Sequence, residues 1–292
     1  GWNVRYRGED IEKGTLVLSR GTVLNPPEIG VLASLGRATA SVIRRPLIAI
    51  MATGNEIVGA GQPLSPGKIH NSNTYSIASQ ISYHGAIPKI LGIARDSVED
   101  LNDKIEAGLS SADMLITTGG VSLGDYDMVK DVLAKRGRID FWTVRMKPGK
   151  PLAFGVLHKK GKGQTQEVPH LGLPGNPVSA MISFEQFARP AIMKMLGKRL
   201  ATKPSITAIM QERITNSDNR RILSRVFITR HGAEYHAHLT GKQGSGILTS
   251  ISKARGMAII PEDTAEVKPG DTVRVELWDW DQDWVYGYSD EA

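Results

Sequence analysis

The stretch DMLITTGGVSLGDYDMVKDVLAKRG (residues 113–137) places an apolar strand, a glycine-rich turn and an amphipathic helix one after another. The run DMLITT is short, apolar and typical of a strand that is covered on both faces of its sheet. In the helix that follows, Val129, Val132 and Leu133 share one face, and Gly137 ends it. A strand, a turn and a helix of these lengths form the repeating unit of an α/β domain.

The same unit recurs on both sides of this stretch. Further strands are predicted at PLIAIMAT (46–53), IPKILGI (87–93), RIDFWTVRM (138–146), PLAFGVL (151–157) and EVPHLGL (167–173). Further helices are predicted at NSNTYSIASQISYHG (71–85), at SVEDLNDKIEAGLSS (97–111) with Ser97 as N-cap, and at NPVSAMISFEQFARPAIMKMLG (176–197), interrupted near Pro190. Regular alternation of this kind predicts a three-layer α/β/α central domain over residues 47–200.

The two flanks have a different pattern. Residues 1–46 are expected to be part of an N-terminal α+β domain, with a strand and turn in TLVLSRGTVL (15–24), a helix at PPEIGVLASLG (26–36) and another strand at ATASVIRR (38–45). Residues 201–292 contain short alternating runs and glycine-rich turns, which predict a small all-β, barrel-like domain.

The composition excludes several kinds of site and partner. The chain has 292 residues, a net charge of +6 and no cysteine, so disulfides, thiolate catalysis and cysteine-ligated zinc are excluded. A cysteine-free chain fits a cytoplasmic location. No apolar run reaches the length of a membrane helix, and the bases form no run interleaved with aromatic residues, so we expect neither a membrane nor a nucleic-acid partner. Because the chain begins at Gly1 rather than Met, we expect a further segment upstream.

The glycine-rich turn is the first of three candidate binding loops, since ligands of α/β domains bind at the carboxyl ends of the strands. Gly119, Gly120 and Gly124 allow a phosphate to approach the backbone, and Asp125 can cap the next helix. A tight turn that needs glycine only for its geometry is the alternative. G-V-S-L-G also matches a hydrolase elbow with Ser122 as nucleophile, but no HGG-type oxyanion loop accompanies it.

Two further loops are expected at the same edge. In LGLPGNPVSA (171–180), Asn176 can cap a helix and Pro177 takes its first position. The alternative is that these residues serve only to begin the helix, since they are common at helix N-termini. In MKPGKPL (146–152), Lys147 and Lys150 flank a stiff Pro-Gly turn. Lysines held in place in this way favour binding of an anionic ligand over the alternative, ordinary solvent-exposed lysines.

Two acidic residues are expected at the same edge of the sheet as the three loops. Glu56 follows the first strand of the domain and Asp96 follows the second. Two carboxylates beside a phosphate site are what Mg²⁺ requires, whereas a helix cap or a surface charge is the alternative for each.

Six segments, in this order, resemble one family. They are ATGNEI (52–57), GKIHNSN (67–73), LGIARD (91–96), TTGGVSLGDYD (117–127), MKPGKPLAFG (146–155) and GLPGNPVSA (172–180). The chain resembles the molybdopterin molybdenumtransferases, a family that includes gephyrin-type E domains. GEDIEKG (8–14) and GKQGSGILTSISKARGMAIIPE (241–262) extend the resemblance over nearly the whole chain.

The resemblance implies a reaction and a set of site residues. Adenylylated molybdopterin and molybdate would be the substrates, AMP would be released, and molybdenum would remain on the dithiolene. The implied pyrophosphate and nucleotide contacts are Gly119, Gly120, Val121, Ser122, Gly124 and Asp125, with the turn residues Gly175, Asn176 and Pro177 beside them. Glu56 and Asp96 would hold Mg²⁺, with Asp127 as an acidic neighbour. The implied oxyanion contacts are Lys147, Lys150, Ser179, Arg220 and Ser245, and Asp10 matches another functional acid.

Three departures from the family pattern bear on these implications. Asn55 stands where the family usually has the aspartate of TGDE, which puts the metal affinity in doubt, and Leu223 replaces a usual aromatic residue. The early S-x-x-D-G-Y/F-A motif is absent from this sequence. In the family that segment helps to build the partner subunit's site, so the homodimer expected from the resemblance can form without being competent.

Two other functions are compatible with the sequence. One is a molybdopterin adenylyltransferase, although its stand-alone relatives resemble only the α/β domain. The other is a non-catalytic interaction module, for which Trp278, Trp280 and Trp284 of the acidic tail leave room.

Overall fold

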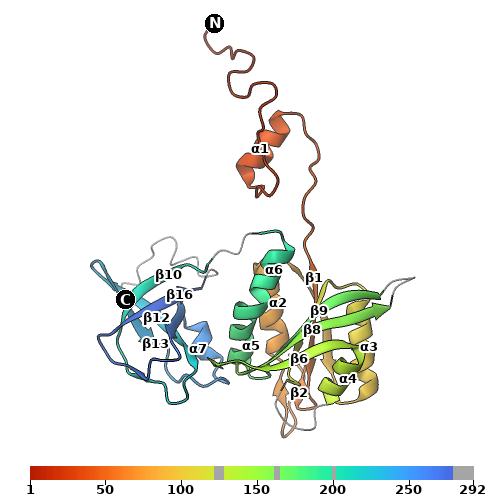
Figure 1. Ribbon diagram of the computed structural model, residues 1–292, viewed down its shortest axis with the longest axis vertical. Coiled ribbons are helices and arrows are strands. Elements are labelled where there is room, and N and C mark those ends of the chain that lie inside the picture. The colour runs from red at the N-terminus through yellow and green to blue at the C-terminus, as the bar shows by residue number, and fades with distance from the viewer. Residues whose placement is uncertain (122–127, 161–164, 199–201, 279–292) are drawn as a thin grey trace. The chain divides into compact units, whose positions relative to one another are not determined.

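The computed structural model describes residues 1–121, 128–160, 165–198 and 202–278, and Figure 1 shows their helices and strands. The chain divides into two compact units, Gly1–Arg44 and Arg45–Ala292. None of the helices in the described ranges is long and apolar enough to cross a membrane.

The first unit contains one helix, α1 (Pro26–Ser34), close to the predicted position. Its start is capped by Glu28, whose carboxylate accepts a hydrogen bond of 2.8 Å from the backbone N–H of Asn25. The strand predicted within 15–24 and the strand predicted at 38–45 are wrong, because no residue of this unit is in a strand. Their apolar side chains, such as Leu16 and Val42, are exposed, and a strand is stable only with a partner that covers one face.

The second unit begins with a six-stranded sheet. In spatial order its strands are β4 (Ile87–Ala94), β1 (Leu47–Thr53), β5 (Met114–Thr118), β9 (Thr165–Leu173), β8 (Pro151–Lys160) and β6 (Gly137–Thr143). The first four are parallel, and β8 and β6 are added antiparallel at one edge. All of β1 except its first residue is buried, as expected for a strand covered on both faces.

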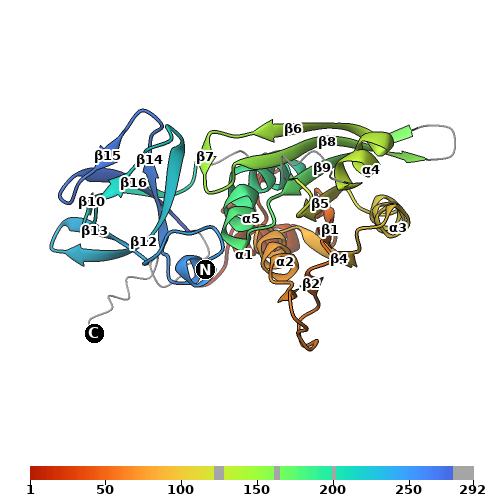
Figure 2. The same cartoon turned by 90° about the horizontal axis from the view of Figure 1, so that it is seen from below.

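Helices cover both faces of this sheet (Figure 2). One face carries α2 (Asn73–Tyr83), α5 (Pro177–Ser183), the π-helical turn η1 (Phe184–Ala188) and α6 (Arg189–Met195). The other face carries α3 (Val98–Leu109) and α4 (Met128–Arg136). The predicted α/β/α layering is therefore confirmed, and so is the Ser97 N-cap, whose side chain accepts from the N–H of Asp100.

The long helix after β9 is interrupted as predicted. The π-helical turn η1 ends at Ala188, two residues before Pro190. Proline has no N–H and its ring crowds the carbonyl four residues earlier, so the helix widens there instead of continuing as regular α-helix.

The remainder of the second unit is a small closed barrel. Its strands are β10 (Ser205–Met210), β12 (Arg221–His231), β13 (Glu234–Leu239), β14 (Gly256–Ile260) and β16 (Thr272–Leu277). They run in the order β13, β10, β16, β14, β12, and β12 pairs back to β13, so the ring has no open edge between them. This confirms the barrel predicted for the C-terminal region.

Short elements connect these parts. They are β2 (Ile57–Val58), β3 (Ile69–His70), β7 (Met146–Lys147), β11 (Ile214–Thr215), β15 (Glu266–Val267) and α7 (Thr249–Ser252). The predicted single strand at 138–146 is in fact two, because β7 leaves the large sheet and pairs with β12 of the barrel. Lys147 is thereby carried to the barrel.

The barrel packs against helix α5 through an apolar cluster. Val178 and Ile182 of α5 belong to the same hydrophobic cluster as Leu223, Met257 and Ile251 of the barrel region, and all five are buried. Leu223, which departs from the family pattern, therefore fills part of this contact with an aliphatic side chain.

Candidate functional site

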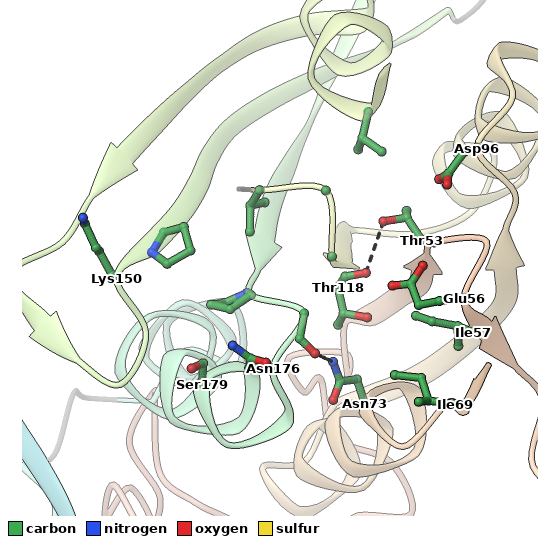
Figure 3. A pocket seen from close by; sticks show the side chains of 18 residues that line it. Thr53, Glu56, Ile57, Ile69, Asn73, Asp96, Thr118, Lys150, Asn176 and Ser179 are labelled. Carbon is green, nitrogen blue, oxygen red and sulfur yellow. Dashed lines mark hydrogen bonds between the residues drawn. The ribbon is translucent and has the colours of Figure 1, made fainter. Parts of the chain in front are cut away.

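A cavity of about 620 Å³ opens at the carboxyl ends of β1, β5 and β9, the edge that the sequence singles out (Figure 3). Its lining consists of Thr53, Gly54, Glu56, Ile57, Ile69, Asn73, Asp96, Thr118, Gly119, Gly120, Val121, Val129, Lys150, Pro151, Pro174, Gly175, Asn176 and Ser179. Nine of the predicted site residues are in this set, drawn from segments that are up to about 120 positions apart (Glu56 to Ser179).

The acidic side of the pocket is held by an unexpected pair. The backbone N–H of Asn55 donates to Asp96 Oδ2 at 3.2 Å, and the N–H of Asp96 donates to Asn55 Oδ1 at 3.2 Å. Asn55, whose presence raised doubt about the metal site, therefore fixes the loop that carries Asp96. The Glu56 carboxylate folds back over Gly54, where an added Cβ would lie 2.5 Å from Glu56 Oε2.

The glycine-rich turn has its own structural reason for glycine. Gly119 has φ +88°, and a Cβ there would meet the Thr53 carbonyl oxygen at 2.8 Å. Its N–H donates to the Leu173 carbonyl at 3.1 Å, so this donor holds the turn to β9 and is not free for a phosphate. Gly119 is thus required by the backbone conformation of the turn, which was the alternative to phosphate binding, although the turn still lines the pocket. Ser122, Gly124, Asp125 and Asp127 lie outside the described residues.

The turn before α5 supplies an amide and a buried hydroxyl. Asn176 occupies the N-cap position but makes no side-chain capping bond, and Ser179 is only 4% exposed. The N–H of Val178 donates to the Ser245 carbonyl at 3.0 Å, so this backbone donor at the start of α5 already has a partner within the protein. Pro177 begins α5 as predicted.

Only one of the two predicted lysines lines the pocket. Lys150 does so, whereas Lys147 lies 3.6 Å from Asp218. Arg220 donates to the same carboxylate through Nε at 2.9 Å and also through Nη2. The hydrogen bond from Arg220, helped by the charges of Arg220 and Lys147, holds the pKa of Asp218 below its usual range. Lys147 and Arg220 thus form an ion-pair cluster with Asp218 and are not among the residues that line the cavity.

Ser245 and Asp10 are not among the lining residues either. Ser245 lies in a turn that the buried Arg225 holds, since Arg225 Nη2 donates to the Gly244 carbonyl at 3.2 Å and its backbone N–H donates to Gln243 at 2.8 Å. Asp10 is exposed and belongs to the first unit.

A buried histidine lies on β9, three residues before the carboxyl end of the strand. His170 is fully buried, and burial lowers its pKa to about 3. Its Nε2 lies 3.2 Å from the Thr117 hydroxyl. His170 is therefore a neutral structural residue at physiological pH and not a proton carrier.

The donor set of the pocket limits which metals it suits. Within the described ranges there is no group of three His, Cys, Asp or Glu residues that could hold an ion. Glu56 and Asp96 both line the pocket, and two carboxylates suit a cation that takes its other ligands from water and from substrate phosphates.

Comparison with known proteins identifies the family. A family model described as "Probable molybdopterin binding domain" matches residues 49–194. Models described as the MoeA N-terminal region (domain I and II) and the MoeA C-terminal region (domain IV) match residues 1–36 and 207–278. The chain is 33% identical over 285 residues to molybdopterin molybdenumtransferase 2 of Mycobacterium tuberculosis, covering 96% of this chain and 67% of that protein. The chain belongs to the MoeA family.

Two further MoeA relatives agree with this assignment. The molybdopterin molybdenumtransferase of Haemophilus influenzae is 34% identical over 277 residues, which is 94% of this chain and 66% of the relative. A crystal structure of the molybdopterin biosynthesis MoeA protein from Pyrococcus horikoshii superposes with a TM-score of 0.74 at 30% identity, covering 92% of this chain and 64% of that one. The chain therefore spans about two thirds of the length of these MoeA proteins.

Sequence reasoning missed three polar residues of the pocket. Thr53 and Thr118 end β1 and β5, and Asn73 begins α2. A signal for the two threonines was present, because each is the polar residue that precedes a glycine at the carboxyl end of an apolar strand. Asn73 stands in the GKIHNSN segment that carried part of the resemblance, but nothing in its neighbours marked it as a pocket residue.

Proposed function

We propose that this chain acts in molybdenum cofactor biosynthesis as a molybdopterin molybdenumtransferase, which takes adenylylated molybdopterin and molybdate, releases AMP and leaves molybdenum on the dithiolene. One observation carries the proposal. A single cavity, in a chain of the MoeA family, combines Glu56 and Asp96 with the Gly119–Gly120 turn and Lys150. Such substrates require carboxylates that bind a cation, a glycine turn that a phosphate can approach and a lysine that binds an oxyanion.

The roles follow from the chemistry of each side chain. Gly119, Gly120 and Val121 would accommodate the pyrophosphate and nucleotide, Gly119 by having no side chain and not through its N–H, which is bonded to Leu173. Asn176 would assist from the α5 turn. Lys150 would attract the molybdate oxyanion, with the Ser179 hydroxyl as a hydrogen-bond donor. The cluster of Lys147 and Arg220 with Asp218 would be a second, partly neutralised cationic surface next to β7.

Mg²⁺ fits the acidic side of the pocket on its donor chemistry. Glu56 and Asp96 would supply two hard oxygen ligands, and substrate phosphates and water would supply the others. When bound, the ion would neutralise charge on the pyrophosphate as AMP leaves. Asn55 would keep Asp96 in place through their two reciprocal hydrogen bonds. A homodimer and a cytoplasmic location remain predictions from the resemblance and the cysteine-free composition.

Release of AMP tests the proposal directly. Purified protein is incubated with adenylylated molybdopterin, Mg²⁺ and molybdate, and AMP is measured by chromatography, in parallel with a version extended to the full length of the MoeA relatives. If neither protein releases AMP, the transferase proposal is wrong.

The lysines give a matched pair of variants for the same assay. Lys150→Met should raise the molybdate concentration needed for half-maximal AMP release roughly tenfold, which corresponds to one charge-assisted hydrogen bond. AMP affinity should change less. Lys147→Met is the control, because Lys147 pairs with Asp218 outside the pocket lining, and its effect should be smaller. Equal losses of molybdate and nucleotide affinity in Lys150→Met would contradict the assignment of Lys150.

A further inference from the structure

A second cavity, which we call the junction groove, lies where the barrel meets the α/β domain. It has a volume of about 390 Å³ and is lined by α2, α5 and the segment that runs from α7 to β14. Figure 1 shows α7 beside α5, between the barrel strands and the large sheet. The lining residues are Ser76, Met181, Leu248, Ile251, Ser252, Ala254 and Arg255. None of them lines the cavity at the carboxyl ends of the strands, so the junction groove is a separate site.

The junction groove combines an apolar lining with one cationic side chain. Four of its seven lining residues are apolar, and all four belong to or pack against the hydrophobic cluster that joins the barrel to α5. The polar groups are the hydroxyls of Ser76 and Ser252 and the guanidinium of Arg255, and no acidic residue is among them. Such a groove suits a ligand that brings an aromatic or apolar group together with negative charge.

The described part of the chain ends at this groove. Strand β16 pairs antiparallel with β14, with Leu277 opposite Gly256, and the N–H of Trp278 donates to the Arg255 carbonyl at 3.0 Å. The Trp278 side chain is buried in the same cluster as Ile251. Consecutive Cα atoms are about 3.8 Å apart, so the residues that follow Trp278 begin within reach of the groove.

The sequence after Trp278 has the matching chemistry. Residues 279–292 read DWDQDWVYGYSDEA, with five acidic residues, four aromatic residues and no base. Side chains two positions apart point to the same side of an extended chain, so Trp280 is expected on the side on which Trp278 meets the cluster. The cations Lys253 and Arg255 lie on the segment that leads into β14, opposite the start of this sequence.

We propose that residues 279–292 bind the junction groove of their own chain, with the Trp280 indole in the groove and acidic residues beside Lys253 and Arg255. This contact connects the end of the barrel to helices α2 and α5. It is independent of the proposed function, because it uses none of the residues that line the cavity at the carboxyl ends of the strands.

Binding of a labelled peptide tests the proposal. A fluorescent peptide of residues 279–292 is titrated with the full chain and with a chain that ends at Trp278, which keeps every described residue, and anisotropy is measured. The shortened chain should bind the peptide. The full chain should bind it at least about tenfold more weakly if the dissociation constant is about 100 µM or lower, because its own tail is present at an effective concentration on the order of 1 mM.

Variants locate the contact. Trp280→Ala in the full chain should free the groove and restore peptide binding to the level of the shortened chain, because a buried aromatic anchor carries much of such an interaction. Trp284→Ala is the matched control, since it removes the same type of side chain from the same segment, and it should leave the peptide excluded. Ser252→Phe, at an exposed position of the groove lining, should weaken peptide binding to the shortened chain roughly tenfold by filling the groove.

Three results would overturn the inference. If the folded shortened chain does not bind the peptide, or binds a peptide of the same composition in rearranged order as tightly, the groove does not recognise this segment. If the full chain binds the peptide as tightly as the shortened chain does, its own tail is not in the groove. If sedimentation shows that removing residues 279–292 splits a larger assembly, the segment occupies the groove of a second copy instead. Where the shortened chain does not fold, the comparison of the full chain with its Trp280→Ala variant decides: equal peptide binding by the two contradicts the proposal.

Discussion

Replacing Glu185 should destabilise the α/β domain more than any surface substitution. Glu185 is 2% exposed, and its carboxylate accepts from Lys203 Nζ at 2.7 Å and Gln80 Nε2 at 2.7 Å, with His84 Nε2 at 3.1 Å. Lys203 is itself nearly buried and lies over the Trp278 ring, 5.1 Å from its centroid. The carboxylate therefore connects helix α2, the turn η1 and the chain segment that enters the barrel.

The expected loss follows from the charge that Glu185→Gln leaves behind. A glutamine keeps the shape, but it places a neutral amide against an ammonium group that has little access to water. Removing one partner of a buried ion pair typically costs about 3 to 5 kcal/mol of the free energy of unfolding. A loss of about 3 kcal/mol corresponds to a drop in melting temperature of roughly 6 to 12 °C in a domain of this size.

Urea denaturation followed by tryptophan fluorescence measures this loss. The double variant Glu185→Gln with Lys203→Met is the control, because removing both charges should cost less than the sum of the two single variants. A loss below about 1 kcal/mol for Glu185→Gln, or strictly additive losses, would refute the view that this pair is buried and coupled.

The pH dependence of the stability provides an independent test of the role of Glu185. Burial by itself would raise the pKa of Glu185, but the hydrogen bonds from His84 and Lys203 and the charge of Lys203 together hold it below its ordinary value of 4.5. A carboxyl with a depressed pKa contributes stability above its unfolded pKa, and this stability is lost as pH falls through the folded pKa. Acidification below pH 4.5 should therefore destabilise the wild type more than Glu185→Gln.

Three further outcomes are expected. His170 has its pKa lowered to about 3, so it stays neutral in the folded chain while the unfolded chain takes up a proton below pH about 6.5. Stability should then fall by up to about 1.4 kcal/mol per pH unit from His170 as the pH drops below that value, and His170→Asn should remove this slope in denaturation curves between pH 7 and 5. Asn55→Asp should tighten Mg²⁺ binding severalfold in calorimetry, since it adds a carboxylate beside Asp96 while keeping the acceptor that holds the Asp96 N–H; unchanged affinity would place the metal elsewhere. Gly119→Ala should cost about 1 to 3 kcal/mol of stability and weaken AMP binding, because φ is +88° and the new Cβ would lie 2.8 Å from the Thr53 carbonyl; an alanine variant with wild-type melting and binding would show that the turn can relax.

The location of the pocket could be predicted because it depends on local patterns. Apolar strands followed by Gly119, Glu56 or Asp96 could be read along the chain, and parallel strands bring their carboxyl ends to one edge. The barrel could be predicted for the same reason, since short alternating runs with tight turns are local signals.

Pairings across the pocket could not be predicted in this way. The resemblance places Lys147 and Arg220 with Lys150 as oxyanion contacts, but in the structure Asp218 pairs with both Lys147 and Arg220. The N-terminal strands were predicted from local sequence alone and are absent from the first unit, where no partner strand covers their apolar residues.

Within the α/β domain, the sequence by itself determined the order of strands and helices, the turns that require glycine and the edge at which polar groups collect, because each depends on residues a few positions apart. The tertiary structure alone decided which of those groups face the cavity. The contacts from Asn73 to Gly175 and from Val178 to Ser245 join residues 102 and 67 positions apart, so they arise only when separate elements pack in one register. Packing also leaves Thr118 Oγ1 and Asn73 Oδ1 without a partner among the described residues, which is a property of the folded chain and not of any segment of sequence.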